Sequence, residues 1–571
     1  MLPLPDFQQL IRDLNQNLPL NQNGLINDLR KWMGPYKMNL PRKSEIWKVY
    51  KSMVDSGAIQ GNPELENLLR KRAIRTISGV APITVMTAPL SCPKNCLYCP
   101  TERNMPKSYL SNQPAAMRAV LSDFDPGAQT SSRLKALHQN GHSTDKIEII
   151  INGGTWSAHP RAYQTWYIKK IFEACNHYDV TKVIGEGIAE SGEAKNIIRK
   201  KLITGHKIEE RLQSEDDSVL IPKLLEEQKI NETGQNRVIG ITLETRPDTI
   251  SAEELARMRM LGATKVEIGV QTLYQDIADL NRREQCVQDV KDATKLLKDA
   301  GFKVAFHMMP AMYGSTPERD IEMFRTLFAD PDLKPDFLKI YPCLVVKDSD
   351  LYEIFKKGDF KPYSTKTLTD VIIAAKQFVP RYCRISRLHR DIPTESIEGG
   401  CTVTNLREII QKELKKRGLV CQCIRCREPK KLMAKEDEVK LSVQEIAVND
   451  TKEFFLSYES LDEKTIYAFC RLRLPSPTNS GVVRAIPELA GAALIRELHT
   501  YGKLIPIGDK NNTESAQHMG FGRRLMAEAE KIAREHGITK MAVIAGIGVR
   551  EYYAKLGYEL EGTYMVKKIR S

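Results

Sequence analysis

Three cysteines, Cys92, Cys96 and Cys99, lie at C-x-x-x-C-x-x-C spacing in the stretch SCPKNCLYCP. A structural zinc site closes with four ligands, whereas an iron–sulfur cubane can be held by three thiolates, which leaves one iron open to a small molecule. A zinc half-site completed from elsewhere, a disulfide and three unrelated thiols are the alternatives. The spacing favours the open cluster, because thiols this close in sequence make poor disulfide partners.

A second cysteine trio, CQCIRC, places Cys421, Cys423 and Cys426 at C-x-C-x-x-C spacing after the basic segment NLREIIQKELKKRG. This pattern is typical of a zinc site that staples a linker, and buried free thiols are the alternative. The spacing does not determine a fourth ligand. The candidates are Cys383, which is favoured because it lies in the preceding linker, and His389, Cys401 and Cys470.

The segment QHMGFGRRLMAEAEKIAREHG predicts a helix that begins with a glycine-containing loop. Its apolar residues share one face, and Gly537 ends it; the face consists of Leu525, Ala529, Ile532 and Ala533. Free N–H groups with little side-chain bulk at a helix start form a cradle for pyrophosphate. The loop lies between the strand-like AALIRELHTYG and KMAVIAGIG, and REYYAKLGY follows. This order indicates acyl-CoA binding.

Five apolar runs that are too short for helices alternate with helical segments from residue 146 onward, in the order KIEIIINGGTW, RVIGITLETRPD, TKVEIGVQTL, FKVAFHMMP and FLKIYPCLV. Helix ends are marked by Ser251 with Glu254, by Gly262 and Gly301, and by Thr316 before Pro317. Alternating strands and helices predict a parallel sheet, and so an α/β fold with a full or partial (β/α) barrel.

Polar residues gather where these strands end, at the rim where barrel folds bind ligands. They are Gly153, Gly154, Thr155, Glu244, Thr245, Arg246, Gln271, His307 and Tyr341. We expect the ligand site at this rim, at the same end as the loop with Cys92. Residues 199–234 interrupt the alternation with a charged stretch, which we interpret as a surface insertion or a short helical pair.

The chain of 571 residues is long enough for two or three domains, and its net charge of +13 favours a polyanionic partner. Residues 1–90 carry 12 lysines and arginines against 7 acidic residues. Apolar residues recur there at helical spacing, as in Leu10, Ile11 and Leu14, and in Ile46, Tyr50 and Met53. The pattern predicts small amphipathic helices with basic outer faces, which suit contacts to nucleic-acid phosphates.

The start MLPLPDFQQLIRDL lacks the features of a signal peptide, and no apolar run reaches membrane-spanning length. We therefore expect a cytoplasmic protein without a membrane partner. Twelve cysteines in a reducing compartment indicate metal ligands or packed thiols rather than a disulfide framework.

Several stretches together resemble the family of Elongator catalytic subunits, which join a radical S-adenosylmethionine domain to a GNAT-type acetyltransferase domain. They include CPKNCLYCP, GHSTDKIEIIINGGTW, ITLETRPD, EIGVQT, GFKVAFHMMP, LKIYPCLV, RELHTYG, QHMGFG and REYYAKLGYELEGTYMVK. The resemblance runs from about residue 75 to the carboxyl end. It implies a basic helical tRNA-binding region at 1–75, a partial (β/α) radical domain at 76–380, a linker with a zinc site at 381–435 and a GNAT-type domain at 436–571.

Carried over by position, the resemblance implies that Cys92, Cys96 and Cys99 hold a 4Fe-4S cluster, whose open iron binds S-adenosylmethionine. Gly153, Gly154, Thr155, Glu244 and Gln271 match further contacts to that cofactor. Lys146 matches a lysine associated with acetyl-CoA, and Tyr552 and Tyr553 cover a tyrosine near the thioester. The remaining acetyl-CoA contacts implied are Glu497, Leu498, His499, Thr500, Ala516, Gln517, His518, Gly520 and Gly522.

The family reaction implied is the formation of 5-carboxymethyluridine at the wobble position of tRNA. A 5′-deoxyadenosyl radical takes a hydrogen from the acetyl methyl of acetyl-CoA, the carbon radical adds to carbon 5 of uracil, and the thioester is hydrolysed. Such chemistry needs a dry pocket and a base held out of the stack. The implied partners are the tRNA anticodon stem-loop, an electron donor, and either a second copy of the chain or Elongator-like subunits.

One departure from the family pattern stands out. The family often has Asn-Arg-Gly-His after the strand that ends in glutamine, whereas this chain has NRREQ at 281–285. Three other functions stay open at this point: a protein lysine acetyltransferase with a structural iron–sulfur cluster, a different radical tRNA enzyme such as a methylthiotransferase, and a tRNA-binding scaffold that senses acetyl-CoA.

Overall fold

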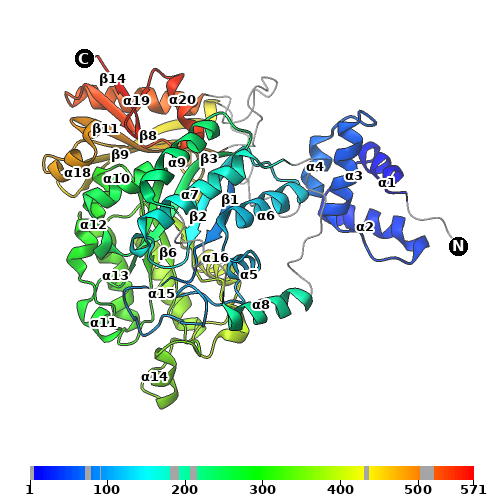
Figure 1. Ribbon diagram of the computed structural model, residues 1–571, viewed down its shortest axis with the longest axis horizontal. Helices are drawn as coiled ribbons and strands as arrows, with labels where there is room; N and C mark the ends of the chain where they lie inside the picture. The colour runs from blue at the N-terminus through cyan, green and yellow to red at the C-terminus, as the bar shows by residue number, and fades with distance from the viewer. Residues whose placement is uncertain are drawn as a thin grey trace.

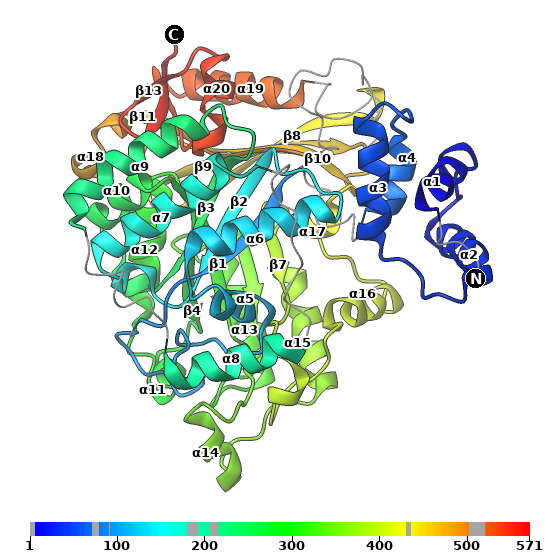
Figure 2. The ribbon, with the colours of Figure 1, turned by 45° about the vertical axis from the view of Figure 1, so that its right-hand side comes forward.

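The computed structural model describes residues 6–70, 79–90, 92–179, 192–205, 215–429, 436–501 and 520–570. Two seven-stranded sheets organise it, one entirely parallel and one mixed. Figures 1 and 2 show the mixed sheet and its helices at one end of the parallel sheet, and a group of helices from the amino-terminal region beside both. Among the described residues no helix combines the length and apolar content that a bilayer crossing requires.

The parallel sheet has its strands in chain order, and β1 does not pair with β7 in the described parts of the chain, so the sheet is an open half-barrel. Its strands are β1 (Ala81–Met86), β2 (Lys146–Asn152), β3 (Arg237–Thr245), β4 (Ala263–Gln271), β5 (Lys303–Met308), β6 (Phe337–Ile340) and β7 (Arg384–Arg387). The predicted α/β half-barrel is confirmed, and the five runs named from sequence form β2 to β6.

Helices cover the outer face of the half-barrel, and several begin and end where the sequence predicts. Ser251 caps α10 (Ala252–Met260) by accepting a hydrogen bond from the Glu254 N–H, and Thr316 caps α13 (Pro317–Ala329). Gly262 and Gly301 follow helix ends with positive φ. The helices are α5 (Pro114–Leu121), α6 (Pro126–Gln139), α7 (Arg161–Asn176), α8 (Gly192–Thr204), α9 (Asp217–Asn231), α10 (Ala252–Met260), α11 (Gln275–Leu280), α12 (Val287–Asp299), α13 (Pro317–Ala329), α14 (Leu351–Lys357), α15 (Thr365–Phe378), α16 (Leu406–Lys416) and α17 (Ile424–Arg427).

The stretch 199–234 contains part of α8 and all of α9, while residues 206–214 lie outside the described residues. The alternative of a helical pair therefore describes this stretch better than a surface insertion. Helix α9 packs on α7 and buries Leu220 and Leu224. Its apolar side chains alternate with charged ones too irregularly to give a clear helical period in the sequence.

The mixed sheet has the order β13-β14-β12-β11-β10-β9-β8, in which only β11 and β12 are parallel neighbours. Its elements are β8 (Val439–Val448), β9 (Thr451–Ser460), β10 (Ile466–Arg473), α18 (Ser480–Ala485), β11 (Ala492–Thr500), α19 (Phe521–Glu535), β12 (Lys540–Val543), α20 (Arg550–Ala554), β13 (Glu559–Glu561) and β14 (Tyr564–Lys568). The predicted apolar face of α19 is buried, and Gly537 follows its end with a φ of 74°.

The amino-terminal helices form a small core of their own. They are α1 (Phe7–Gln16), α2 (Gln22–Met33), α3 (Lys43–Asp55) and α4 (Pro63–Leu69). Helices α1 and α3 bury the residues predicted from helical spacing. The group joins the half-barrel at the end of α6, where the Arg70 Nε donates to the Gly141 carbonyl at 2.7 Å.

The two sheets are joined by a buried network of charged side chains. Arg496 of β11 donates to Asp336, which precedes β6, and to Glu453 of β9. Lys298 of α12 also donates to Glu453, and Arg473 of β10 donates to Asp299. All of these side chains are at most 8% exposed. Because every charge has an opposite partner, the network can remain ionised without water.

Candidate functional site

The interior of the half-barrel encloses a cavity of about 1100 Å³, the upper cavity, lined by inward side chains of the parallel strands. Its lining includes Glu148, Asn152, Glu244, Lys265, Glu267, Gln271, His307, Lys339, Tyr341, Arg384 and Ser386. A barrel interior is commonly filled by branched apolar residues. The polar lining here indicates a site that binds a ligand rather than a packed core.

A network of carboxylates and cations lies along this wall. The ring of His307 lies between two glutamates, with Nε2 3.0 Å from Glu267 Oε2 and Nδ1 3.6 Å from Glu244 Oε1. Lys339 donates to Glu267, and the Tyr109 hydroxyl donates to Glu244 at 2.7 Å. Although burial favours the neutral acid, Lys339 and His307 hold the pKa of Glu267 well below its usual range.

The loop with the first cysteine trio follows β1, at the end of the half-barrel where the strands finish. Cys92 Sγ lies 3.6 Å from Thr155 Oγ1, and the Cys99 N–H donates to the Cys96 carbonyl in a tight turn. These three sulfur atoms do not form a group within 4.8 Å of one another in the described part of the chain. Cys96 and Cys92 nevertheless lie close enough to Cys99 to act on its thiol electrostatically, so the loop gathers three thiolate donors, the donor set that an open cluster uses.

Backbone geometry marks two of the predicted contacts at this rim. Gly153 has a φ of 133°, and a side chain there would overlap Thr87 Oγ1, so only glycine fits. Gln271 has a φ of 69°, which is strained for a residue with a side chain, and it lines the upper cavity beside Glu244. Thr155 touches Cys92, whereas Gly153, Gly154 and Thr155 do not line the upper cavity.

A second cavity of about 860 Å³, the lower cavity, lies between the amino ends of the parallel strands and the mixed sheet. It brings together Lys146 of β2 and the predicted residues of the acetyltransferase-like half. The latter are Glu497, Leu498, His499, Thr500, Gly520, Gly522, Tyr552 and Tyr553. Ala516, Gln517 and His518 lie outside the described residues. Burial lowers the pKa of Lys146, which raises its share of the neutral amine.

The amino end of α19 faces the lower cavity. Gly520 precedes the helix with a φ of 68°, and nothing in the described structure lies within 4 Å of where a side chain would begin. A side chain on Gly522 would come 2.8 Å from the Tyr552 hydroxyl. The space beside Gly520 is thus open within the described structure, and the anion cradle at this helix start stays a prediction.

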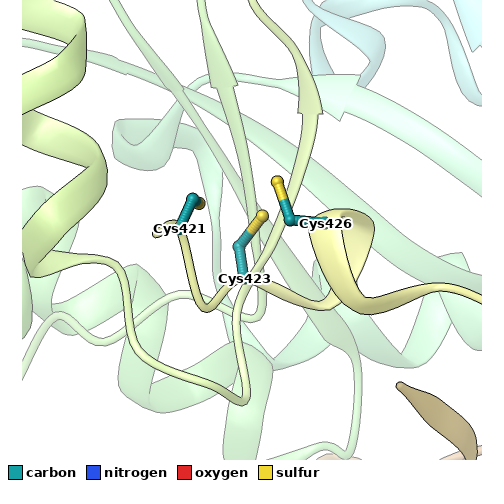
Figure 3. A group of neighbouring side chains, drawn as sticks. All are labelled: Cys421, Cys423 and Cys426. Carbon is teal, nitrogen blue, oxygen red and sulfur yellow. The ribbon is translucent and has the colours of Figure 1, made fainter. Parts of the chain in front are cut away.

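Figure 3 shows the second cysteine trio, with Cys421 and Cys423 in a loop and Cys426 in α17. Their sulfur atoms lie within 4.8 Å of one another, which suits one metal ion. The Lys376 ammonium lies 3.8 Å from Cys426 Sγ, so a cation faces these thiols. Cys383 is buried, and its carbonyl accepts from the Ile424 N–H, but its sulfur is not part of the 4.8 Å group.

Sequence reasoning missed several residues that the fold brings to the site. Arg283 Nη1 lies 3.6 Å from Cys96 Sγ, although the residues around it were noted only as a departure from the family pattern. Glu267 and Lys339 lie inside apolar strand runs, and their inward direction follows from the strand register. His307 lies at the predicted rim, but the sequence gives no sign of its two glutamate partners.

Family models match three parts of the chain. The Radical SAM superfamily model matches residues 191–327, the Radical SAM C-terminal domain model matches residues 335–416, and the acetyltransferase (GNAT) family model matches residues 444–558. The cysteine loop at 92–99 precedes the matched segments. The half-barrel and the mixed sheet therefore correspond to these two kinds of domain.

Curated relatives match almost the whole chain. The tRNA uridine(34) acetyltransferase of Methanocaldococcus jannaschii is 40% identical over 88% of this chain and 86% of its own length. Elongator complex protein 3 of Homo sapiens is 36% identical over 88% of this chain and 86% of its own length. The solved structure of the N-terminally deleted Elp3 of Methanocaldococcus infernus matches with a TM-score of 0.69 at 38% identity, covering 86% of this chain and all of that one.

Proposed function

The chain belongs to the family of tRNA uridine(34) acetyltransferases and Elongator complex protein 3, and from this membership we propose that it modifies the wobble uridine of tRNA by radical chemistry. The proposed product is 5-carboxymethyluridine, with S-adenosylmethionine as the radical source and acetyl-CoA as the carbon donor. The radical SAM and GNAT domains are both present, so the chain has a domain for each cosubstrate.

One observation carries this proposal: the upper and lower cavities meet inside the same half-barrel. Val80, Glu148, Lys265 and Arg384 line both of them. Acetyl-CoA held by the mixed sheet would therefore point its acyl end toward the space below the cysteine loop. An acetyltransferase that acts on protein lysines would need an acceptor path to the thioester, but no radical site beyond it.

We assign the cysteine loop and the upper cavity to the radical half of the reaction. Cys92, Cys96 and Cys99 would hold a 4Fe-4S cluster, and that group, when bound, supplies reductive cleavage of S-adenosylmethionine. Thr155 touches Cys92, and Gly153, Gly154 and Thr155 would contact the cofactor beside the loop. Glu244 and Gln271 offer polar side chains at the strand ends, where hydroxyl and amino groups of a nucleoside need partners.

The lower cavity would bind acetyl-CoA. The open amino end of α19 accepts the pyrophosphate, and residues 497–500 run along the extended arm of the cofactor as the edge of β11. Lys146, Tyr552 and Tyr553 face the same space and are the groups that we propose act at the thioester. Tyr552 lies nearest the helix start, and Tyr553 is the more deeply buried.

The tRNA would enter from the side of the amino-terminal helices. Gln22, Lys43 and Arg70 from that region line the upper cavity. Six further arginines line it as well: Arg118, Arg133, Arg384, Arg387, Arg390 and Arg425. Cations at this density match a phosphate backbone, and the cavity behind them is large enough for an extruded base.

We propose that each part of the chain has the function that the family resemblance implies. Residues 1–75 would bind tRNA, 76–380 would carry out the radical chemistry, 381–435 would hold a zinc site and 436–571 would bind acetyl-CoA. Zinc would bind Cys421, Cys423 and Cys426, and Cys383 remains the predicted fourth ligand. An electron donor, partner subunits or a second copy of the chain, and a cytoplasmic location also remain predictions.

The test is nucleoside mass spectrometry after anaerobic incubation of the iron-loaded protein with tRNA, reductant, S-adenosylmethionine and acetyl-CoA. We expect 5-carboxymethyluridine only in the complete mixture, together with 5′-deoxyadenosine. Omitting acetyl-CoA is the control for the carbon source. A complete mixture that yields acetylated lysines and no modified uridine would favour the protein acetyltransferase instead.

A further inference from the structure

The two cavities meet at Val80 and three charged side chains near the amino ends of the parallel strands. Glu148 comes from β2, Lys265 from β4 and Arg384 from β7, and each lines both cavities. The cysteine loop lies at the carboxyl ends of the strands, whereas the acetyltransferase half lies at their amino ends. Any group that moves from one cavity to the other inside the half-barrel must therefore pass these side chains.

Lys265 and Glu148 form an ion pair across the sheet. The Lys265 Nζ donates to Glu148 Oε1 at 2.8 Å, lies 3.8 Å from Glu267 Oε1 and lies 5.3 Å from the centre of the Phe337 ring. Thr242 Oγ1 donates to the same Glu148 oxygen at 3.1 Å. Although burial favours the neutral acid, Lys265 and the other neighbours lower the pKa of Glu148 to about 2, so this carboxyl group is ionised at neutral pH.

Arg384, the third charged residue that lines both cavities, is held more firmly than the Glu148–Lys265 pair. Arg384 Nε donates to Glu428 Oε1 at 2.8 Å, and Glu428 also accepts from Arg425 at 2.6 Å and from the Tyr501 hydroxyl at 3.2 Å. Arg384 is therefore anchored by Glu428, which has two further donors of its own and lines only the lower cavity. The Lys265 ammonium instead has a second carboxylate, Glu267, within 3.8 Å, so the Glu148–Lys265 pair is the part of the constriction that can rearrange.

An alternative partner for Glu148 lies on β5, one strand beyond Lys265 in the sheet. Lys303 of β5 is the register neighbour of Lys265 and lines only the lower cavity. Within the described residues it has no hydrogen bond or ion pair of its own, and Glu497 and Glu148 are the carboxylates that act on it electrostatically. Glu148 can therefore exchange one ammonium for another without becoming a buried unpaired charge.

We propose that the Glu148–Lys265 ion pair is the gate between the two cavities and sets the length of acyl group that reaches the upper one. This inference rests on the proposed function, because it takes an acyl-CoA as the occupant of the lower cavity. The four-carbon stem of Lys265 occupies the space beside the passage. A two-carbon acetyl group fits past it, whereas a longer acyl chain requires the volume that this stem fills.

The test compares acetyl-CoA with propionyl-CoA in the wild-type protein and in Lys265→Ala. The ratio of propionyl-derived to acetyl-derived modified uridine is measured by mass spectrometry, since the two products differ by one methylene. Removing the stem should raise this ratio roughly tenfold, which is the discrimination that one methylene supports in a fitted pocket. Lys265→Met keeps most of the length of the side chain but breaks the ion pair, so it should raise the ratio by a smaller factor than Lys265→Ala.

Lys356→Ala is the matched control, because it removes an exposed lysine that pairs with Glu353 on α14, away from both cavities. Its ratio should equal that of the wild type. If Lys265→Ala does not accumulate as folded protein, Glu148→Gln serves in its place. That change releases Lys265 from its partner and should move the ratio in the same direction by a smaller factor.

Calorimetric binding of the two acyl-CoAs without tRNA gives a second readout that needs no nucleoside modification. The ratio of dissociation constants should shift toward propionyl-CoA in Lys265→Ala. Equal ratios in the wild type and this variant, in binding and in product, would overturn the gate. A wild-type protein that binds acetyl-CoA but leaves tRNA unmodified would instead contradict the proposed function, and the binding ratios would still decide the gate.

Discussion

Among single residues, Arg283 is a buried cation that contacts the cysteine loop. It is 7% exposed, it lies 3.6 Å from Cys96 Sγ, and it also donates to the Gly269 carbonyl at the end of β4. A buried guanidinium beside a thiolate compensates its negative charge. We infer that Arg283 helps the loop to hold an anionic cluster against the half-barrel.

Arg283→Met should therefore lower the rate of 5′-deoxyadenosine formation by about tenfold to a hundredfold, the range typical of changes next to metal ligands. Loss of a nearby positive charge should also make the cluster harder to reduce, which a spectroscopic redox titration measures directly.

Arg282→Met is the control for Arg283→Met. Arg282 is the neighbouring residue, but it is exposed and pairs with Asp350 at 3.2 Å on the surface. Its variant should keep wild-type rate and potential. Identical rates and potentials in all three proteins would show that Arg283 has no influence on the loop.

At the element scale, the start of α19 shows how a helix can offer a binding site without side chains. Gly520 adopts a left-handed conformation, and the space beside it is open in the described structure. Gly537 at the other end of the same helix has the same properties. The two glycines thus provide equal backbone strain at the two ends, and only one end faces the lower cavity.

Gly520→Val should raise the dissociation constant for acetyl-CoA at least tenfold, or about 1.4 kcal/mol, because the side chain fills the approach to the helix N–H groups. Gly537→Val should cost similar stability, on the order of 1–2 kcal/mol, and leave binding unchanged. Calorimetry and thermal unfolding separate the two effects. Equal loss of binding in both variants would refute the cradle.

Most helices and strands of the half-barrel could be predicted from the sequence. Parallel strands buried on both faces give continuous apolar runs, so β2 to β6 could be predicted, and caps such as Thr316 marked helix starts. The four-residue β7 was missed because Arg384 and Arg387 break its apolar character. Lys265 and Glu267 were likewise hidden within an apolar run, since only strand pairing shows that they face a common cavity.

Contacts between distant segments explain the rest of what the sequence could not reveal. No local pattern connects Arg283 with Cys96, which lie 187 residues apart, or Arg496 with Asp336, which lie 160 residues apart. Motif spacing predicted an acetyl-CoA site and a cluster site separately. That the upper and lower cavities share lining residues within one half-barrel follows only from how the two sheets pack.

At the scale of the whole molecule, the buried charge network fixes the two sheets relative to each other. Arg496 is fully buried and bonds Asp336 at 3.1 Å, Glu453 at 3.1 Å and the Phe302 carbonyl at 2.6 Å. Arg496→Met would leave two carboxylates short of a partner. We expect a loss of about 3–5 kcal/mol in the free energy of unfolding, measured by chemical denaturation.

The control for Arg496→Met is Arg319→Met. Arg319 makes a bidentate ion pair with Asp276, but on the exposed surface. Its removal should cost less than about 1 kcal/mol. If the two variants lose equal stability, the network does not hold the sheets together.

The same network predicts how stability depends on pH. Although burial alone would raise it, Arg496 and Lys298 hold the pKa of Asp336 well below its usual range. A carboxylate with a lowered folded-state pKa contributes its full stability above its unfolded value, near pH 4, and loses it as the pH falls below that value.

Below about pH 4, the free energy of unfolding should therefore fall by up to about 1.4 kcal/mol per pH unit for this group alone. Asp336→Asn should be less stable at neutral pH and show a shallower decline in acid. Denaturation curves collected between neutral pH and pH 3 measure both slopes. A variant whose decline is as steep as that of the wild type would show that Asp336 is not the group responsible.

We propose that the half-barrel joins an acetyl-CoA site and a radical site into one reaction space. The most direct measurement follows deuterium from acetyl-CoA with a trideuterated methyl group into 5′-deoxyadenosine, under anaerobic turnover with tRNA. We predict that the recovered 5′-deoxyadenosine carries one deuterium and that the modified uridine retains the acetyl carbons. Unlabelled 5′-deoxyadenosine alongside modified tRNA would contradict the account.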